Sequence, residues 1–112
     1  MNKVELMGRL TKDVEVLTYN AGNEKKKMVK FSIAVQRKRD KEKVDFFDCI
    51  AYGSTAKALN DFVKKGERII VEGTMQTDIY TNKEGKNVKT YTVLVNDFYF
   101  TEYKKTDKKE EF

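Results

Sequence analysis

The chain has 112 residues, which is enough for one domain and too few for a second independent core. Hydrophobic residues make up 39% of the chain and charged residues 37%, so a small core must lie under a highly charged surface. Histidine is absent and cysteine occurs once, which excludes histidine-based catalysis and an intramolecular disulfide and indicates a reducing compartment.

The first part of the chain predicts strands separated by short polar segments. Residues 3–10 alternate between apolar and polar side chains, which indicates a half-buried strand, and residues 14–19 continue its strand character. A turn is expected at residues 20–23. Residues 28–36 predict a second strand with apolar odd-numbered positions, and residues 37–43 predict an extended basic loop.

Residues 44–52 predict a third strand that carries aromatic side chains on both of its faces. One face holds Phe47, Cys49 and Ala51, and the other holds Phe46, Asp48, Ile50 and Tyr52. An unpaired carboxylate is costly to bury, so the face that contains Asp48 is expected to lie outside the core.

The only predicted helix spans residues 54–63. Ser54 is its expected N-cap, and Gly66 follows its end. Ala56, Leu59 and Val63 share one apolar face, which is expected to pack against the strands.

Two long strands complete the chain. Residues 69–77 predict a fourth strand, residues 82–85 a hairpin tip, and residues 90–100 a fifth strand. This order predicts an all-β fold, a five-stranded antiparallel OB-fold barrel with one short helix between strands 3 and 4. The domain is expected to span residues 1–103, followed by a short flexible polar tail at residues 104–112.

The positive charge is concentrated in one segment. Residues 25–43 contain nine Lys or Arg against Asp40 and Glu42, a local balance of +7 that leaves −2 for the rest of a chain with net charge +5. Such a patch fits nucleic acid or another polyanion. The alternative interpretation is a solvated, lysine-rich hairpin.

The second and third strands together predict a shallow surface of aromatic and basic side chains. Bases stack on exposed rings irrespective of their identity, and lysine and arginine follow the phosphate backbone. Phe46 and Tyr52 are the candidate rings, Tyr80 is a third, and Lys30 lies on the open side of the second strand. The alternative is that Phe46 and Tyr52 are buried in a subunit interface.

Nothing in the sequence predicts a catalytic or metal-binding site. Asp45 and Asp48 project to opposite faces of a strand, and Glu84 of the nuclease-like spacing that begins at Asp78 falls in a turn. Cys49 has no base to activate it. We therefore expect no catalytic residue, no metal and no cofactor.

Several motifs together resemble the bacterial and phage single-stranded-DNA-binding proteins (SSB). They are Asn2-Lys-Val, Gly8-Arg-Leu-Thr-Lys-Asp13, the segment DFFDCIAYG at 45–53, Lys65-Gly66 and Val71-Glu-Gly73. The resemblance covers roughly residues 2–100 in order. It implies a non-enzymatic homotetramer with an OB-fold that binds single-stranded DNA without sequence specificity during replication, recombination or repair.

The resemblance also suggests individual binding residues. Phe46 and Tyr80 match positions where the family often has a stacking tryptophan, and Tyr52 matches a stacking aromatic beside a glycine. The expected single-stranded-DNA-binding residues are Phe46, Tyr52, Tyr80, Lys30, Arg37, Lys38, Arg39 and Lys65. Tryptophan is absent, Arg39 replaces an aromatic residue, and Asp48 and Asp78 stand where the family commonly carries basic residues.

The end of the chain also differs from bacterial relatives, which usually have a long linker and an acidic tip. The short tail is more typical of a phage or mobile-element member, and it ends in Glu110, Glu111 and Phe112. The resemblance implies that these residues dock replication or recombination proteins, and an ordinary polar terminus is the alternative. The absence of a long apolar run predicts a cytoplasmic protein that does not enter the membrane, within a bacterial host if phage-encoded.

A different function remains open for the same fold. An OB-fold adaptor or RNA-binding protein would use the open face for a protein or a structured RNA.

Overall fold

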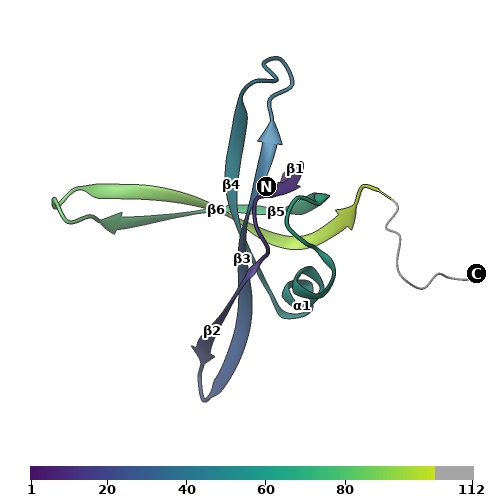
Figure 1. Ribbon diagram of the computed structural model, residues 1–112. Helices are drawn as coiled ribbons and strands as arrows, with labels where there is room; N and C mark the ends of the chain where they lie inside the picture. The colour runs from purple at the N-terminus through teal and green to yellow at the C-terminus, as the bar shows by residue number, and fades with distance from the viewer. Residues whose placement is uncertain (103–112) are drawn as a thin grey trace, which may run out of the picture.

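A computed structural model describes residues 1–102 of the chain as six strands and one helix (Figure 1). The elements are β1 (Val4–Leu10), β2 (Glu15–Ala21), β3 (Glu24–Gln36), β4 (Val44–Tyr52), α1 (Gly53–Phe62), β5 (Arg68–Thr81) and β6 (Asn87–Phe100).

The strands form one sheet that closes on itself. Its order is β1-β5-β6-β4-β3-β2, and β1 pairs with β3 as well as with β5. This closure and the helix between β4 and β5 confirm the expected OB-fold. One pairing departs from the expected antiparallel arrangement, because β4 and β6 meet in parallel at Cys49–Val93 and Ile50–Leu94.

The first expected strand is divided into β1 and β2, which raises the number of strands from five to six. At the division the backbone of Leu10 bonds to Glu67 and Gly66, and the N–H of Thr11 donates to the carbonyl oxygen of Ser32. The chain therefore changes partners here: β1 pairs with β5 and, at its end, with β3, and β2 continues along β3 alone.

The interior of the barrel is filled by alternate side chains from its strands. The buried residues include Val29, Phe31 and Ile33 of β3, Cys49 and Ala51 of β4, Ile69 and Val71 of β5, and Val93 and Val95 of β6. Phe47 is half-buried and packs against them. The inward faces expected for the second and third strands are therefore confirmed.

Helix α1 covers one end of this core with Ala56 and Leu59. Its N-cap is Tyr52, which makes no side-chain capping bond, so the expectation that Ser54 caps the helix is wrong. Gly53 has φ +60, a left-handed conformation that glycine adopts at little cost. The chain thus turns from strand to helix one residue earlier than the sequence pattern indicates.

Hairpins extend from the barrel in different directions (Figure 1). The tip of the β5–β6 hairpin lies at the expected residues, where Asn82 Oδ1 accepts bonds of 2.9 Å from the N–H groups of Glu84 and Lys86. This capped turn lets β5 and β6 pair as far as Thr81 and Asn87, further than expected.

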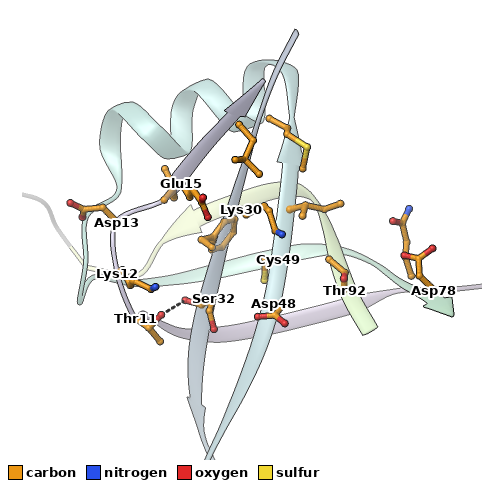
Figure 2. A pocket seen from close by; sticks show the side chains of 16 residues that line it. Thr11, Lys12, Asp13, Glu15, Lys30, Ser32, Asp48, Cys49, Asp78 and Thr92 are labelled. Atoms are coloured by element: carbon orange, nitrogen blue, oxygen red, sulfur yellow. Dashed lines mark hydrogen bonds between the residues drawn. The ribbon is translucent and has the colours of Figure 1, made fainter. Parts of the chain in front are cut away.

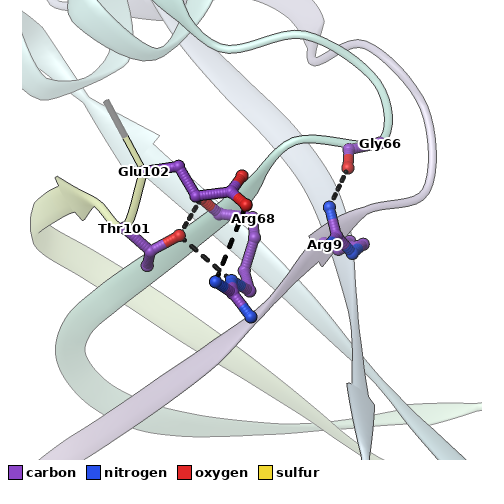
Figure 3. A network of polar contacts seen from close by, with 5 residues as sticks. All are labelled: Arg9, Gly66, Arg68, Thr101 and Glu102. Carbon is purple, nitrogen blue, oxygen red and sulfur yellow. Dashed lines mark hydrogen bonds and ion pairs between the residues drawn. The ribbon is translucent and has the colours of Figure 1, made fainter. Parts of the chain in front are cut away.

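Polar contacts join the end of β6 to the start of β5 (Figure 3). Arg68 Nε donates to Thr101 Oγ1 at 3.1 Å, and the Thr101 hydroxyl donates to the Arg68 carbonyl at 3.1 Å. Arg9 Nη1 donates to the carbonyl of Gly66 at 2.9 Å.

Within residues 1–102, no helix is long and apolar enough to cross a membrane.

Candidate nucleic-acid interface

Strand β4 presents two aromatic rings on the outer face of the barrel. Phe46 is 66% exposed and Tyr52 is 41% exposed, whereas Cys49 and Ala51 between them are buried. The two-residue alternation of the strand therefore separates the rings from the core, as the position of Asp48 predicted. A ring held on a paired strand is displayed in a fixed place, which suits stacking.

A groove of about 820 Å³ lies on the outer face between these rings. We call it the outer groove; its lining includes Lys12, Lys30, Ser32, Asp48, Ile50, Asp78 and Thr92 (Figure 2). Thr11 Oγ1 donates to the carbonyl of Ser32 at 3.3 Å and holds the 11–15 segment at its side. The groove brings Lys30 together with Asp48 and Asp78, which come from three different strands.

The outer groove does not carry a net positive charge. Its lining contains Lys12 and Lys30 against the carboxylates of Asp13, Glu15, Asp48 and Asp78. Neither the Asp48 nor the Asp78 carboxylate has a hydrogen bond or ion pair within the described residues. Negative charge therefore lies on the same face of the barrel as the expected rings.

The expected basic residues around the loop at 37–43 are not equivalent. Arg37 donates from Nε and Nη2 to both carboxylate oxygens of Asp45, each at 3.0 Å. These hydrogen bonds hold the pKa of Asp45 below its ordinary value. Lys38 and Arg39 are exposed and make no such contact within the described residues. The positive charge of Arg37 is thus paired with Asp45, whereas the charges of Lys38 and Arg39 are unpaired within the described residues.

The loop itself is folded rather than extended, which corrects the expectation for residues 37–43. Arg37 N–H donates to the Lys43 carbonyl and Lys43 N–H to the Asp40 carbonyl, both at 3.0 Å. Gln36 Nε2 donates to the Lys41 carbonyl at 2.7 Å. These bonds fix the positions from which the basic side chains project.

The other two expected residues lie at the margins. Tyr80 is 53% exposed on the β5–β6 hairpin, where it pairs with Val88. Lys65 is exposed after α1, and its backbone N–H donates to Asp13 Oδ1 at 2.7 Å, which places it beside the 11–15 segment. Glu110, Glu111 and Phe112 lie outside the described residues.

Two tyrosines near the expected rings were missed by sequence reasoning. Tyr91 of β6 lines a hollow shared with Phe46 and Phe47, and Tyr19 of β2 contacts Tyr52 with ring centroids 5.7 Å apart. Both are aromatic residues on strands, and the residues next to them are polar. The sequence alone contains this signal of an exposed ring. Which ring each one meets depends on strand register, which the sequence pattern does not give.

The one cysteine of the chain lies beneath this face, in the core. Cys49 is 1% exposed, and burial raises the pKa of its thiol to about 12. Among residues 1–102, no group of three or more His, Cys, Asp or Glu side chains is placed to hold a metal ion.

A closed barrel with a helix between β4 and β5 and exposed rings on its outer face defines an OB-fold domain of the oligonucleotide-binding type. Residues 1–101 match the model of the Single-strand binding protein family, and the chain belongs to this family.

Similar proteins carry consistent names. The chain is 39% identical over 100 residues to a single-stranded DNA-binding protein of Clostridium perfringens, covering 89% of this chain and 65% of that protein. It is 31% identical over 104 residues to one of Onion yellows phytoplasma, covering 93% and 97%. The chain therefore spans about two thirds of the first relative and nearly all of the second.

A solved structure shares the fold. A chain described as "Plasmodium falciparum SSB complex with ssDNA" superposes with a TM-score of 0.74 at 20% identity. The match covers 91% of this chain and 96% of that chain.

Proposed function

We propose that this protein binds single-stranded DNA without sequence specificity and thereby protects and organises it during replication, recombination or repair. The observation that carries the proposal is the display of Phe46 and Tyr52 on the outer face of a closed barrel. Membership of the Single-strand binding protein family supports it.

In this proposal the affinity comes mainly from stacking. Each base stacked on Phe46, Tyr52 or Tyr80 contributes about 1–3 kcal/mol, and stacking tolerates every base because every base has a π-face. A duplex offers no free base faces along its length, so selection for single strands follows from the same contacts. The protein acts by binding alone and without catalysis.

Phosphate contacts are assigned to the basic side chains around the rings. The exposure of Lys38 and Arg39 at the tip of the β3–β4 hairpin supports this assignment, as do the positions of Lys30 in the outer groove and Lys65 at its margin. Arg37 contributes less charge than the sequence implied, because Asp45 neutralises it.

A titration of intrinsic fluorescence tests the proposal. The chain has six tyrosines and no tryptophan, so quenching of tyrosine emission reports stacking directly. We expect oligo-dT to quench strongly and duplex DNA weakly at the same salt concentration. Equal affinity for duplex DNA would contradict single-strand binding, and preference for oligo-U or a structured RNA would favour the RNA-binding alternative.

We further propose a homotetramer in the cytoplasm, in which each subunit supplies one binding face. Sedimentation velocity measures this state directly. If Phe46→Ala dissociates the oligomer and leaves binding per subunit intact, Phe46 belongs to an interface instead.

We also propose that Glu110, Glu111 and Phe112 dock replication or recombination proteins. The test is a pull-down with the full chain and with a chain that lacks residues 107–112, which should lose the partner.

A further inference from the structure

A second groove begins where Tyr52 ends the outer face. It lies between the β2–β3 hairpin and α1 and has a volume of about 750 Å³, within the range of about 300–1,000 Å³ that ligand sites occupy. We call it the helix-side groove; Tyr19, Lys26, Lys27, Tyr52, Lys57 and Asn60 line it.

The groove has an aromatic and apolar interior. The rings of Tyr19 and Tyr52 meet edge to face at an interplanar angle of 83°, and Tyr52 is still 41% exposed in this contact. Val16, also in the lining, is 43% exposed, although a valine is normally buried. Open ring surface beside open aliphatic surface offers a base a place to stack.

The charge at the rim distinguishes this groove from the outer groove. Lys57 Nζ pairs with Asp61 Oδ2 at 2.6 Å, which cancels their charges. Lys26 and Lys27 have no hydrogen-bonded or ion-paired side-chain partner within the described residues. Two lysines on the hairpin are therefore available to a polyanion, whereas the outer groove presents more carboxylates than lysines.

The position of Tyr52 joins the two surfaces. Tyr52 is the last residue of β4 and the N-cap of α1, so its ring stands at the border between the outer face and the helix-side groove. Tyr52 is therefore part of both surfaces, and a DNA strand that stacks on it from the outer face would lie beside the helix-side groove.

We propose that the helix-side groove binds the continuation of the same single strand, with a base against Tyr19 and Val16 and phosphates against Lys26 and Lys27. This inference rests on the proposed function and extends it to residues outside the expected site. It gives the lysine-rich β2–β3 hairpin a role as the distal part of the binding path. The occupant is single-stranded DNA rather than an acidic peptide, because the groove continues the stacking face.

The length of the DNA provides the first test. Oligo-dT of about 4 to 16 nucleotides, the range of site sizes known for one OB-fold, is titrated into wild type and Tyr19→Ala. We expect Tyr19→Ala to lower the affinity for long oligonucleotides by roughly 5- to 150-fold and to leave short ones unchanged. An equal loss at every length would mean that Tyr19 only positions Tyr52, and it would overturn the inference.

The second test measures the contribution of the lysines, with matched substitutions on two hairpins. Lys26→Gln with Lys27→Gln should lower the slope of log K against log salt by about 0.7 for each contacted phosphate, for long oligonucleotides only. Lys83→Gln with Lys86→Gln removes the same charge from the β5–β6 hairpin and should have a smaller effect. Equal effects of both pairs would indicate non-specific charge and contradict the groove.

A fluorescent reporter removes the risk that Tyr19→Ala perturbs the fold. Tyr19→Trp keeps an aromatic ring and introduces the chain's only tryptophan, and Phe46→Trp does the same on the outer face. We expect short oligo-dT to quench the Phe46→Trp protein and only longer oligo-dT to quench the Tyr19→Trp protein. If oligo-dT quenches Phe46→Trp and never Tyr19→Trp, the groove inference fails and the proposed function stands. If no oligonucleotide binds either protein, the proposed function itself fails.

Discussion

Phe46 and Tyr52 lie on one face of one strand but in different surroundings. Phe46 is the more exposed ring and has no ring partner within the described residues, whereas Tyr52 contacts Tyr19. A base that stacks on Phe46 therefore covers surface that was largely open to water. A base that stacks on Tyr52 joins an existing aromatic pair.

Alanine substitutions should separate these two situations. We expect Phe46→Ala to weaken binding to oligo-dT by about 1–3 kcal/mol and to leave stability unchanged. Tyr52→Ala should weaken binding by a similar amount and also lower the free energy of unfolding by about 0.5–1.5 kcal/mol, through loss of the contact with Tyr19. Fluorescence titration and urea unfolding measure the two quantities.

Tyr99→Ala serves as the control for these substitutions. Tyr99 is also an exposed tyrosine, but its hydroxyl bonds to Glu72 at 3.3 Å beside β1, away from the outer groove. Its removal should leave DNA binding within about twofold of wild type. A loss as large as that of Phe46→Ala would show that affinity does not depend on the outer-face rings.

Cys49 illustrates how burial controls a single reactive group. The thiol points into the core, and desolvation, with a smaller contribution from Asp48, raises its pKa to about 12. Only the thiolate reacts rapidly, so the native protein should react with iodoacetamide at pH 8 far more slowly than the protein unfolded in urea. Mass spectrometry of the alkylated chain measures the difference. Equal rates in both states would show that the barrel opens readily around β4.

At the scale of elements, the β5–β6 hairpin depends on an irregularity at Glu72 and Gly73. The register shifts there because Asn96 of β6 has no partner between the pairs Glu72–Asp97 and Gly73–Val95, a β-bulge on β6 that increases the local twist before the two strands continue as the arm that carries Tyr80. A Cβ atom at Gly73 would overlap the carbonyl oxygen of Leu94 on the paired strand. Glycine is therefore required by close approach of two backbones.

Gly73→Ala should accordingly be one of the most damaging substitutions in the protein. We expect a loss of more than about 3 kcal/mol of unfolding free energy, since the clash is with backbone and cannot be relieved by a side-chain rotation. Gly22→Ala is the comparison, because Gly22 has φ +66 and open space around it and should cost only about 1–2 kcal/mol. Urea unfolding of both variants measures the order. A Gly73→Ala protein as stable as Gly22→Ala would mean that the β5–β6 pairing relaxes easily.

The sequence predicts some elements closely and others poorly, for physical reasons. β4 was predicted at its observed bounds, because the period-two pattern and the carboxylate of Asp48 together fix its orientation. β3 begins earlier than expected, at Glu24, because Lys25, Lys26 and Lys27 are held by backbone pairing with β2 and show no apolar alternation.

The candidate site also has some features that the sequence predicts and others that it does not. Exposure of Phe46 and Tyr52 follows from their own strand and could be predicted. The pairing of Arg37 with Asp45 and the contact of Tyr19 with Tyr52 depend on turn geometry and cross-strand register, so they appear only in the folded chain. Closure of the barrel likewise brings Asp48 and Asp78 into one groove from separate strands.

At the scale of the whole molecule, charge is distributed unevenly around the binding face. Most of the +7 of residues 25–43 lies on the β2–β3 and β3–β4 hairpins, on either side of an outer groove that contains Lys30 but in which carboxylates outnumber lysines. A phosphate backbone is thus attracted to the hairpins and repelled from the middle of the face. This arrangement favours bases in the outer groove and backbone along its margins.

Removing the groove carboxylates should strengthen binding. Asp48→Asn with Asp78→Asn eliminates two unpaired negative charges near the proposed DNA path, and two charges about 4 Å apart in water interact by about 1 kcal/mol. We expect the affinity for oligo-dT to rise by about 3- to 30-fold at low salt and the gain to shrink as salt screens the interaction. Asp97→Asn, an exposed aspartate on β6 outside the groove lining, is the matched control and should change affinity little. If the double variant instead binds more weakly, the carboxylates accept hydrogen bonds from base edges, and binding to oligo-dC should then fall more than binding to oligo-dT.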